Sequence, residues 1–396
     1  MGRRTSILIV PGLLAAPVLA VMALLLASCA LGDDGPPIVD EAFYRQTFPM
    51  TAGEQGRLLD SQTPDGVPDG YRGWRILYQS VDVLGQPAVV SGMVLRPDRD
   101  APVGGWPIVG FAHGTTGIAD GCAPSRDPSA LALVQNIVDD GYAVVETDYV
   151  GLGTAGVHPY LDGNSEGRAV LDSLRAARQI TALRAGSTAA IWGYSQGGHS
   201  ALFAGQLAVT EGADLGIVGV VDQAGPSRTD FALGGRSISS RYEFFLLTSV
   251  ASSATRLGLR LDSIIGPGGV AAAPEIIADG STVCPNFGAI ARAVPVGERV
   301  SDPVAAHPEW EVAFAALDLS SAPAVAPVFI QHGTADEIVP FAESVIARAR
   351  LCSAGTSVTF HPQANGVHLT AIDPIPPLSW LADIRRGTTP RNDCRR

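Results

Sequence analysis

The sequence predicts an α/β fold, in which a mostly parallel β-sheet carries helices on both faces and is interrupted by a large, mainly helical insertion. Short apolar runs recur along the chain, and such runs are typical of parallel strands buried on both faces. Helical patterns separate the runs, as crossover connections between parallel strands require. Between two of the runs lie about 100 residues, far more than an ordinary connection contains.

The strand signals are of two kinds. Residues 71–80 and 88–95 resemble strands on either side of a breaker at residues 84–87, which predicts an antiparallel hairpin. Residues 41–60 have a mixed pattern and are expected to wrap the edge of the fold. The buried strands are predicted at residues 107–112, 143–147, 189–192, 215–221, 327–330 and 358–361.

Helices are predicted at residues 129–140 and 164–177, and the second begins with a cap at Asn164 or Ser165. The long interval, residues 226–322, is interpreted as a helical cap, or lid, over the carboxyl edge of the sheet, where ligands of such sheets bind. The alternative is an insertion that does not contact a ligand. The core domain then comprises residues 41–225 and 323–396.

The N-terminal segment has the features of an export signal. Two arginines precede an apolar run, and the sequence Leu-Ala-Ser-Cys at residues 26–29 resembles a bacterial lipobox. Residues 1–28 are therefore predicted to be a lipoprotein signal peptide, Cys29 the lipid-bearing residue and residues 29–40 a tether. An ordinary secretory signal or an uncleaved anchor helix is the alternative. In either case we expect an exported protein, lipid-anchored at the cell membrane or secreted.

The composition excludes several classes of function. The formal net charge of −12 argues against nucleic acid as a partner. All 27 basic residues are arginine, and the absence of lysine excludes Schiff-base chemistry, Ser-Lys dyads and a Walker A loop. No spacing of Cys or His indicates a metal site, and no cofactor is expected. Besides Cys29, an even number of cysteines suggests two disulfides with three possible pairings among Cys122, Cys284, Cys352 and Cys394.

A nucleophile is predicted where the strand at residues 189–192 meets the next helix. Residues 193–197 read Gly-Tyr-Ser-Gln-Gly, the pattern of a nucleophile elbow, which exposes a serine hydroxyl on a sharp strand-to-helix turn. Ser195 is the predicted nucleophile, and glycines on either side allow strand and helix to approach closely. The alternative is a glycine-rich turn with a buried serine.

Ser195 requires a base, because a serine hydroxyl is barely ionised at neutral pH. In this architecture the acid and then the histidine follow the serine in the chain. His368 lies in a loop beyond the last predicted strand, from which its imidazole can reach the serine, and it is the predicted base. His361, which ends that strand, is the alternative, whereas His332 is expected to shape a turn.

The acid should hold the imidazole in the correct tautomer and stabilise its charged form. Asp336 is the predicted acid, because it follows the strand at residues 327–330 directly. Glu337 and Asp222 are its competitors, and an Asx turn is the alternative role for Asp336.

An oxyanion hole needs two backbone N–H groups that face the developing negative charge. Gln196, the residue after the nucleophile, should supply one of them. The loop after the strand at residues 107–112 should supply the other, from Thr115 or alternatively from Thr116.

With these segments in place, the sequence resembles the secretory lipase family of α/β-hydrolases, known from fungi and actinobacteria. The resemblance covers roughly residues 55–385. It implies a large lid before the acid, and a disulfide between Cys122 and Cys284, which leaves Cys352 paired with Cys394. The lipobox departs from the pattern of the secreted fungal members. The motifs that carry the resemblance lie at residues 113–117, 122–125, 148–153, 193–198 and 332–340.

Members of this family cleave triacylglycerols and other carboxylic esters. The resemblance therefore implies a lipase or esterase that acts on an acyl ester or lipid substrate, attached to the membrane through Cys29. An acyltransferase or a peptidase with the same three side chains is one alternative. A non-catalytic lipoprotein that binds apolar ligands is the other.

Overall fold

The computed structural model describes residues 40–127, 134–228, 242–277, 294 and 307–394, and of residues 242–246 it describes the helix but not the side chains. The predicted signal peptide, Cys29 and nearly all of the predicted tether lie outside these residues. Asp40–Arg396 form one compact unit. Among the described helices, none is long and apolar enough to cross a membrane.

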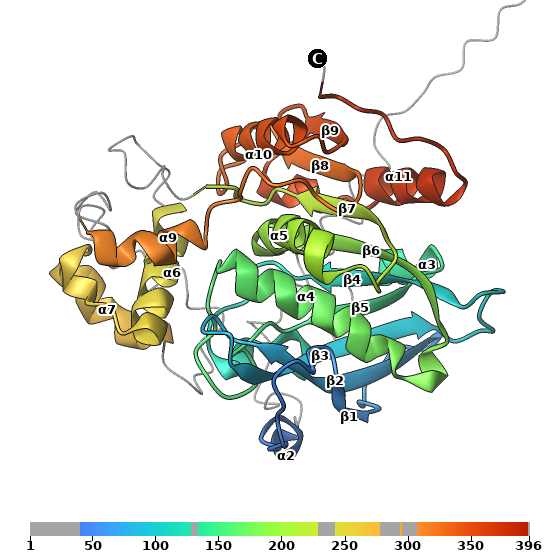
Figure 1. The fold of residues 1–396 in the computed structure, drawn as a ribbon, viewed down its shortest axis with the longest axis horizontal. Coiled ribbons are helices and arrows are strands. Elements are labelled where there is room, and N and C mark those ends of the chain that lie inside the picture. The colour runs from blue at the N-terminus through green and yellow to red at the C-terminus, as the bar shows by residue number, and fades with distance from the viewer. Residues whose placement is uncertain (1–39, 128–133, 229–241, 278–293, 295–306, 395–396) are drawn as a thin grey trace, which may run out of the picture. The chain divides into compact units, whose positions relative to one another are not determined.

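The unit is built around a nine-stranded sheet with the order β1-β2-β3-β5-β4-β6-β7-β8-β9 (Figure 1). Neighbouring strands are antiparallel from β1 to β5 and parallel from β5 to β9. Each predicted strand is present, most of them one to four residues longer than expected at an end. The strands are β1 (Leu58–Gln62), β2 (Tyr71–Val81), β3 (Pro87–Pro97), β4 (Trp106–Ala112), β5 (Ala143–Thr147), β6 (Ala185–Tyr194), β7 (Ile217–Gln223), β8 (Val328–Gly333) and β9 (Val358–Gln363).

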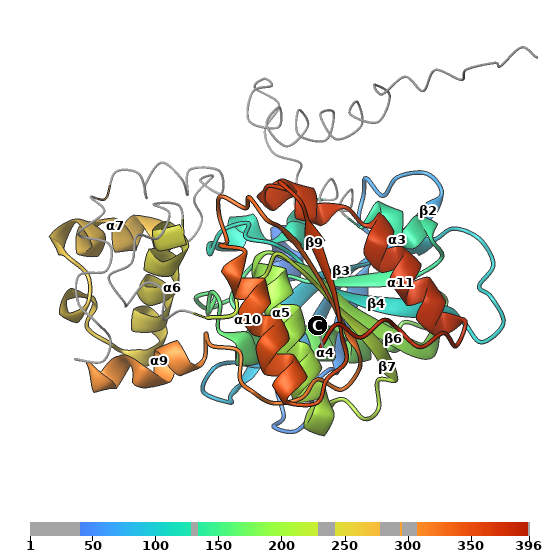
Figure 2. The ribbon, with the colours of Figure 1, turned by 90° about the horizontal axis from the view of Figure 1, so that it is seen from above.

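Helices cover both faces of the sheet (Figure 2). One face packs against α4 (Gly163–Arg178), α5 (Gln196–Glu211) and α10 (Ala342–Ser353), and the other against α3 (Gln135–Asp139) and α11 (Ile375–Arg385). In β4, Ile108 belongs to the first of these two cores and its neighbour Val109 to the second, and both are fully buried. Burial on both faces explains why the strand is apolar at consecutive positions.

Two local predictions need correction. The N-cap of α4 is Asp162, whose carboxylate accepts the amide of Ser165 at 2.9 Å, so Asn164 lies within the first turn. Residues 41–60 also form more regular structure than expected, namely the short helix α2 (Glu41–Tyr44) and the strand β1. Because β1 pairs only with β2 at the edge of the sheet, burial imposes little pattern on its sequence.

The chain between β7 and β8 forms helices that contact the carboxyl edge of the sheet. Its buried side chains, among them Leu247, Val250 and Trp310, form one cluster with Ile118 and Tyr160 from the loops that follow β4 and β5. The described elements of this insertion are α6 (Tyr242–Leu257), η6 (Leu261–Ser263), α7 (Pro267–Ile277), η9 (Pro308–Trp310) and α9 (Glu311–Ala315). The remaining 3-10 helices are η1 (Asp120–Cys122), η2 (Pro124–Arg126), η4 (Thr181–Leu183) and η10 (His368–Ile372).

A disulfide joins Cys352 at the end of α10 to Cys394, across a Cα–Cα distance of 5.3 Å. It fixes the C-terminal segment beside β9, where the amide of Asp393 donates to the carbonyl of Val358. Cys122 is also disulfide-bonded, and its expected partner Cys284 lies outside the described residues. In the described part of the chain no group of His, Cys, Asp and Glu side chains could hold a metal ion.

Glu146 of β5 is a buried carboxyl group, 2% exposed, and neither of its oxygens has a hydrogen-bond partner. Burial, with a smaller contribution from the charge of Asp148, raises the pKa of Glu146 to about 8. Because this pKa lies above the ordinary value of 4.5, the folded protein binds the proton more tightly than the unfolded chain does. The contribution of Glu146 to the unfolding free energy is therefore most favourable below about pH 4.5 and is lost as the pH rises towards 8.

Replacing Glu146 by glutamine should therefore stabilise the protein increasingly as the pH rises. We expect the difference in unfolding free energy from the wild type to grow between pH 5 and pH 8 by a few kcal/mol, on the order of 1.4 kcal/mol per pH unit. Denaturant unfolding at both pH values measures it, with exposed Glu275→Gln as the matched control. A difference independent of pH would show that Glu146 is not protonated in the folded protein.

Candidate active site

Ser195 occupies the turn between β6 and α5. Its backbone has φ 56° and ψ −119°, a strained conformation for a residue with a side chain, and its amide donates to the carbonyl of Gln223 at 2.8 Å. A Cβ atom at Gly193 would overlap the backbone of Gly197, and one at Gly197 would overlap the backbone of Ala112. The two glycines of the motif are thus required by the close approach of strand and helix.

The structure brings Ser195, His368 and Asp336 together. His368 Nε2 lies 2.9 Å from Ser195 Oγ, and His368 Nδ1 lies 2.7 Å from Asp336 Oδ2. Since a carboxylate only accepts hydrogen bonds, Nδ1 carries the proton and Nε2 is left to accept one from the serine hydroxyl. His368 begins η10, and the ring of Tyr194 packs against its imidazole with 5.1 Å between centroids.

Asp336 is fully buried in the turn after β8, where its Oδ1 accepts the amides of Ile338 and Val339 at 2.8 Å each. Burial alone would raise the pKa of this carboxyl group. Hydrogen bonds from His332 and His368, then the charge of His368 and the Ile338 amide, outweigh burial and hold the pKa well below its usual range. Asp336 is therefore ionised at neutral pH.

The competing acids have other contacts. Glu337 accepts the backbone amide of His368 at 3.1 Å, so it contacts the main chain of that residue. Asp222 accepts the amide of Gly225 at 2.8 Å, and burial raises its pKa to about 7.

Three other histidines that follow Ser195 in the chain have different contacts. The ring of His361 stacks on Phe329, with 5.9 Å between the centroids. His199 Nε2 donates to the carbonyl of Leu317 at 2.9 Å, from the first turn of α5. His332 contacts the same oxygen of Asp336 as His368 does, with 3.0 Å between Nε2 and Oδ2.

The two residues expected at the oxyanion hole come from different elements. Gln196 is the first residue of α5, where a helix leaves its backbone N–H groups without partners in the helix. Its side-chain Nε2 donates to Glu166 Oε1 at 2.7 Å and lies 2.8 Å from His158 Nε2. Thr115 lies in the loop after β4, and its hydroxyl is 2.7 Å from the hydroxyl of Tyr160.

Glu166 contacts Gln196, although nothing in the sequence indicates that it lies near the candidate active site. It is fully buried and accepts the amide of Leu161 at 2.8 Å and the hydroxyl of Ser200 at 2.5 Å, besides Gln196. Burial opposes its charge, but the neighbouring imidazoles of His199, whose Nδ1 lies 3.8 Å from Oε2, and of His158, together with the hydrogen bond from Ser200, hold its pKa below the usual value. In the sequence it looks like an ordinary acidic residue in the first turn of a helix.

Helix α6 of the insertion forms hydrogen bonds with the segment that contacts Gln196 and Thr115. Ser252 of α6 is fully buried; its hydroxyl donates to the carbonyl of His158 and accepts the amide of Tyr160 at 3.3 Å. Because Tyr160 contacts Thr115 and His158 contacts Gln196, α6 reaches both expected oxyanion residues through one intermediate residue each.

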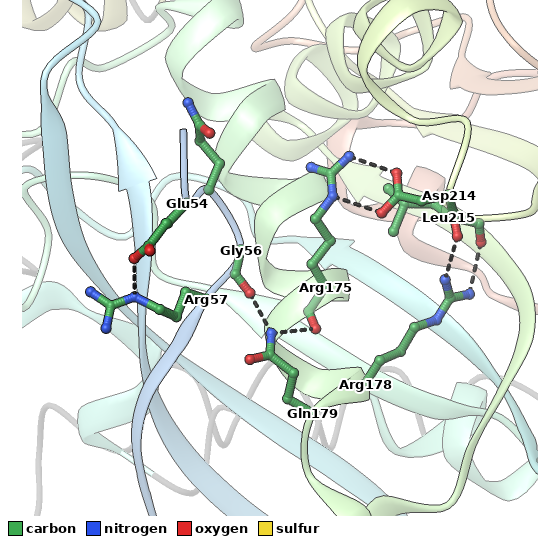
Figure 3. A pocket seen from close by; sticks show the side chains of 9 residues that line it. Glu54, Gly56, Arg57, Arg175, Arg178, Gln179, Asp214 and Leu215 are labelled. Atoms are coloured by element: carbon green, nitrogen blue, oxygen red, sulfur yellow. Dashed lines mark hydrogen bonds and ion pairs between the residues drawn. The ribbon is translucent and has the colours of Figure 1, made fainter. Parts of the chain in front are cut away.

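A pocket lies at the opposite end of α4, between its last turn and the segment that precedes β1 (Figure 3). Arg175 forms a bidentate ion pair with Asp214, and Arg178 donates to the carbonyls of Asp214 and Leu215. These arginines therefore connect neighbouring segments of the fold. Glu166 and Arg178 are separated by about 18 Å along the helix axis, at 1.5 Å per residue, so the pocket is distinct from the site around Ser195.

Solved structures share this architecture. The structure titled Candida antarctica lipase A in its closed state has a TM-score of 0.72 with this chain at 22% identity, covering 89% of this chain and 87% of that one. The rice cell wall degrading esterase LipA from Xanthomonas oryzae has a TM-score of 0.69 at 20% identity, covering 84% of this chain and 98% of that one. The fold is that of an α/β-hydrolase.

Sequence comparisons find similarity to lipases. The model of the secretory lipase family matches residues 129–233 and 309–392. Lipase A of Moesziomyces aphidis is 25% identical in an alignment that covers 91% of this chain and 82% of that protein. Lipase 5 of Candida albicans is also 25% identical, covering 89% of this chain and 82% of that protein. The chain is thus similar to secretory lipases over these residues, and it is a serine hydrolase of the lipase type.

One relative is described differently. A protein of Mycobacterium tuberculosis that is 25% identical over 48% of this chain is named a probable inactive lipase. Catalytic activity therefore depends on the residues at the site, and in this chain a serine, a histidine and an aspartate are in contact there.

Proposed function

We propose that this protein hydrolyses carboxylic esters of lipid type through an acyl-enzyme formed on Ser195, with His368 as general base and Asp336 as its orienting acid. The observation that carries the proposal is the continuous series of contacts from the serine hydroxyl through both imidazole nitrogens to the carboxylate, at 2.9 and 2.7 Å. Both distances are within hydrogen-bond reach, as nucleophilic catalysis by serine requires.

The proposed steps follow from these contacts. Ser195 Oγ attacks the ester carbonyl carbon as its proton passes to His368 Nε2, and Asp336 stabilises the resulting imidazolium through Nδ1. The amides of Gln196 and Thr115 stabilise the oxyanion of the tetrahedral intermediate. His368 then returns the proton to the leaving alcohol as the C–O bond breaks. Water, deprotonated by His368, hydrolyses the acyl-enzyme and restores the serine.

The substrate class is proposed from the relatives and from the insertion. Lipases among the relatives imply a lipid or other ester substrate. The apolar cluster shared by α6 and the loops after β4 and β5 stands beside the residues around Ser195, which favours an ester with an apolar acyl group. Similarity to a secretory family supports export, and we propose that residues 1–28 direct it and that Cys29 carries the lipid anchor.

Labelling with a fluorophosphonate probe tests the nucleophile. We expect one covalent adduct, mapped to the peptide that contains Ser195, and a burst of p-nitrophenol when a p-nitrophenyl ester is added in excess, because acyl-enzyme accumulates. Adding alcohols as acceptors separates hydrolysis from acyl transfer. A protein that binds apolar esters but is neither labelled nor acylated would contradict the proposal and favour a binding lipoprotein.

A further inference from the structure

His332 is a fully buried histidine that the mechanism above does not use. It lies at the end of β8, four residues before Asp336. Its Nε2 is 3.0 Å from Asp336 Oδ2 and 3.0 Å from the carbonyl oxygen of Val339. Its Nδ1 is 2.5 Å from the hydroxyl oxygen of Ser344 on α10. Every polar atom of the ring therefore has a partner.

These partners determine where the proton of the ring lies. A carboxylate oxygen and a backbone carbonyl both accept hydrogen bonds, so Nε2 must donate and carries the proton. In the neutral ring Nδ1 is then an acceptor, and the hydroxyl of Ser344 can donate to it. The arrangement holds His332 as the Nε2–H tautomer, oriented towards Asp336.

The contacts of Asp336 show how the orientation of His332 affects the carboxylate. A carboxylate has about four acceptor positions. Asp336 Oδ1 accepts two amides and Oδ2 faces two imidazoles, that of His368 and that of His332, whose single Nε2–H is shared with the carbonyl of Val339. Because the two imidazoles share one oxygen, each restricts where the other can bond. His332 thereby limits rotation of the carboxylate.

We propose that His332 is a positioning residue that holds the Asp336 carboxylate towards His368, so that the contacts extend in one series from Ser344 through His332, Asp336 and His368 to Ser195. The inference rests on the proposed function, because it assigns a purpose to His332 only if Asp336 orients the base. His332 itself does not contact the substrate or the reacting atoms.

The charges around Asp336 and His332 determine the pH dependence that we expect. Loss of the His332 donor leaves the carboxylate with more charge to stabilise the His368 imidazolium, so the acidic limb of kcat/KM should move to higher pH. The other titratable groups that face Asp336 and His332 are Glu337 from the same turn, Asp222 from the end of β7, Tyr194 from β6 and His199 beyond Asp222. They are unchanged in the variants below.

The test compares His332→Phe, which keeps a planar ring but has no donor, with His332→Gln, whose amide can donate from nearly the same position. For His332→Phe we expect kcat about tenfold lower, an unchanged KM, and an acidic limb displaced upward by about 0.5 pH unit. His332→Gln should restore most of kcat and the wild-type pH profile. Thr359→Val is the matched control, because it removes buried hydrogen bonds to Trp380 and Arg391 without changing a charge.

A folded His332→Phe protein with wild-type kcat and pH profile would overturn the inference, as would the same pH displacement in Thr359→Val. If His332→Phe does not fold, ¹⁵N NMR of the histidines in the wild-type protein decides, with His332→Gln providing the assignment. A neutral Nε2–H tautomer at position 332 supports the inference, and an Nδ1–H tautomer overturns it. Retained activity in Ser195→Ala would instead contradict the proposed function, independently of His332.

Discussion

Replacing Ser195 by alanine is expected to lower kcat for p-nitrophenyl ester hydrolysis by about 10⁴- to 10⁶-fold. The variant lacks the only atom of this residue that can attack the carbonyl, and His368 Nε2 loses the hydroxyl that lies 2.9 Å away. The amides of Gln196 and Thr115 can still polarise a bound ester, so a residual rate above that of water should persist. Stopped assays at saturating substrate measure the loss.

Loss of activity in Ser195→Ala identifies the nucleophile only if the variant still folds. Alanine at position 195 keeps the backbone amide that donates to Gln223, and the positive φ at this position is strained for serine and alanine alike. Thermal unfolding of the variant should therefore remain close to that of the wild type. An inactive variant with an unchanged melting temperature supports the nucleophile, whereas a variant within tenfold of wild-type kcat would exclude it.

Replacing Asp336 by asparagine is expected to lower kcat by about 10³- to 10⁴-fold. The amide oxygen of asparagine can accept hydrogen bonds from only some of the groups that now donate to Asp336. Its NH₂ group would face a backbone amide or an imidazole N–H, and two donors cannot form a hydrogen bond with each other. His368 is then no longer held with its proton on Nδ1, and its imidazolium loses the adjacent negative charge. The loss should be smaller at alkaline pH, where other bases can assist the serine, and a pH series of kcat measures this.

Asp222→Asn is the matched control, since this carboxyl group is also buried and lies near the end of the neighbouring strand β7. Asp222 caps Gly225 and has no contact with His368 among the described hydrogen bonds, so we expect kcat to stay within about tenfold of the wild type. A large loss in Asp222→Asn together with an active Asp336→Asn would reverse the assignment of the acid.

The sequence predicted the parallel part of the sheet well because those strands are buried on both faces, as Ile108 and Val109 show. Burial then appears directly in the sequence as an uninterrupted apolar run. The edge strand β1 has no such constraint and was missed. The cap of α4 was displaced to Asn164, because several residues there can cap a helix and only the backbone conformation at Asp162 decides among them.

At the site, the sequence indicated residues that follow strands directly, since the ends of parallel strands meet at one edge of the sheet. It indicated Ser195 and Asp336 for this reason and His368 because it lies in the loop beyond the last strand, and these are the residues that the structure brings together. Glu166 was not recognised because its partners Gln196 and Ser200 are distant in sequence. His332 was not recognised because its contact with Asp336 depends on the conformation of the turn that both residues belong to. A buried carboxylate on a helix and a histidine after a strand have no distinctive spacing, and His332 was interpreted only as a residue that shapes a turn.

The hydroxyl of Ser252 has a consequence for protein engineering. Since α6 is hydrogen-bonded to residues 157–160 through the side chains of Ser252 and Arg256, transplanting the insertion between related proteins is not an exchange of independent modules. A donor sequence without a hydroxyl at this place would lose the contacts that Ser252 makes with the carbonyl of His158 and the amide of Tyr160. Chimaeras that keep serine or threonine at position 252 should therefore be the ones that retain the recipient's chemistry while acquiring the donor's selectivity.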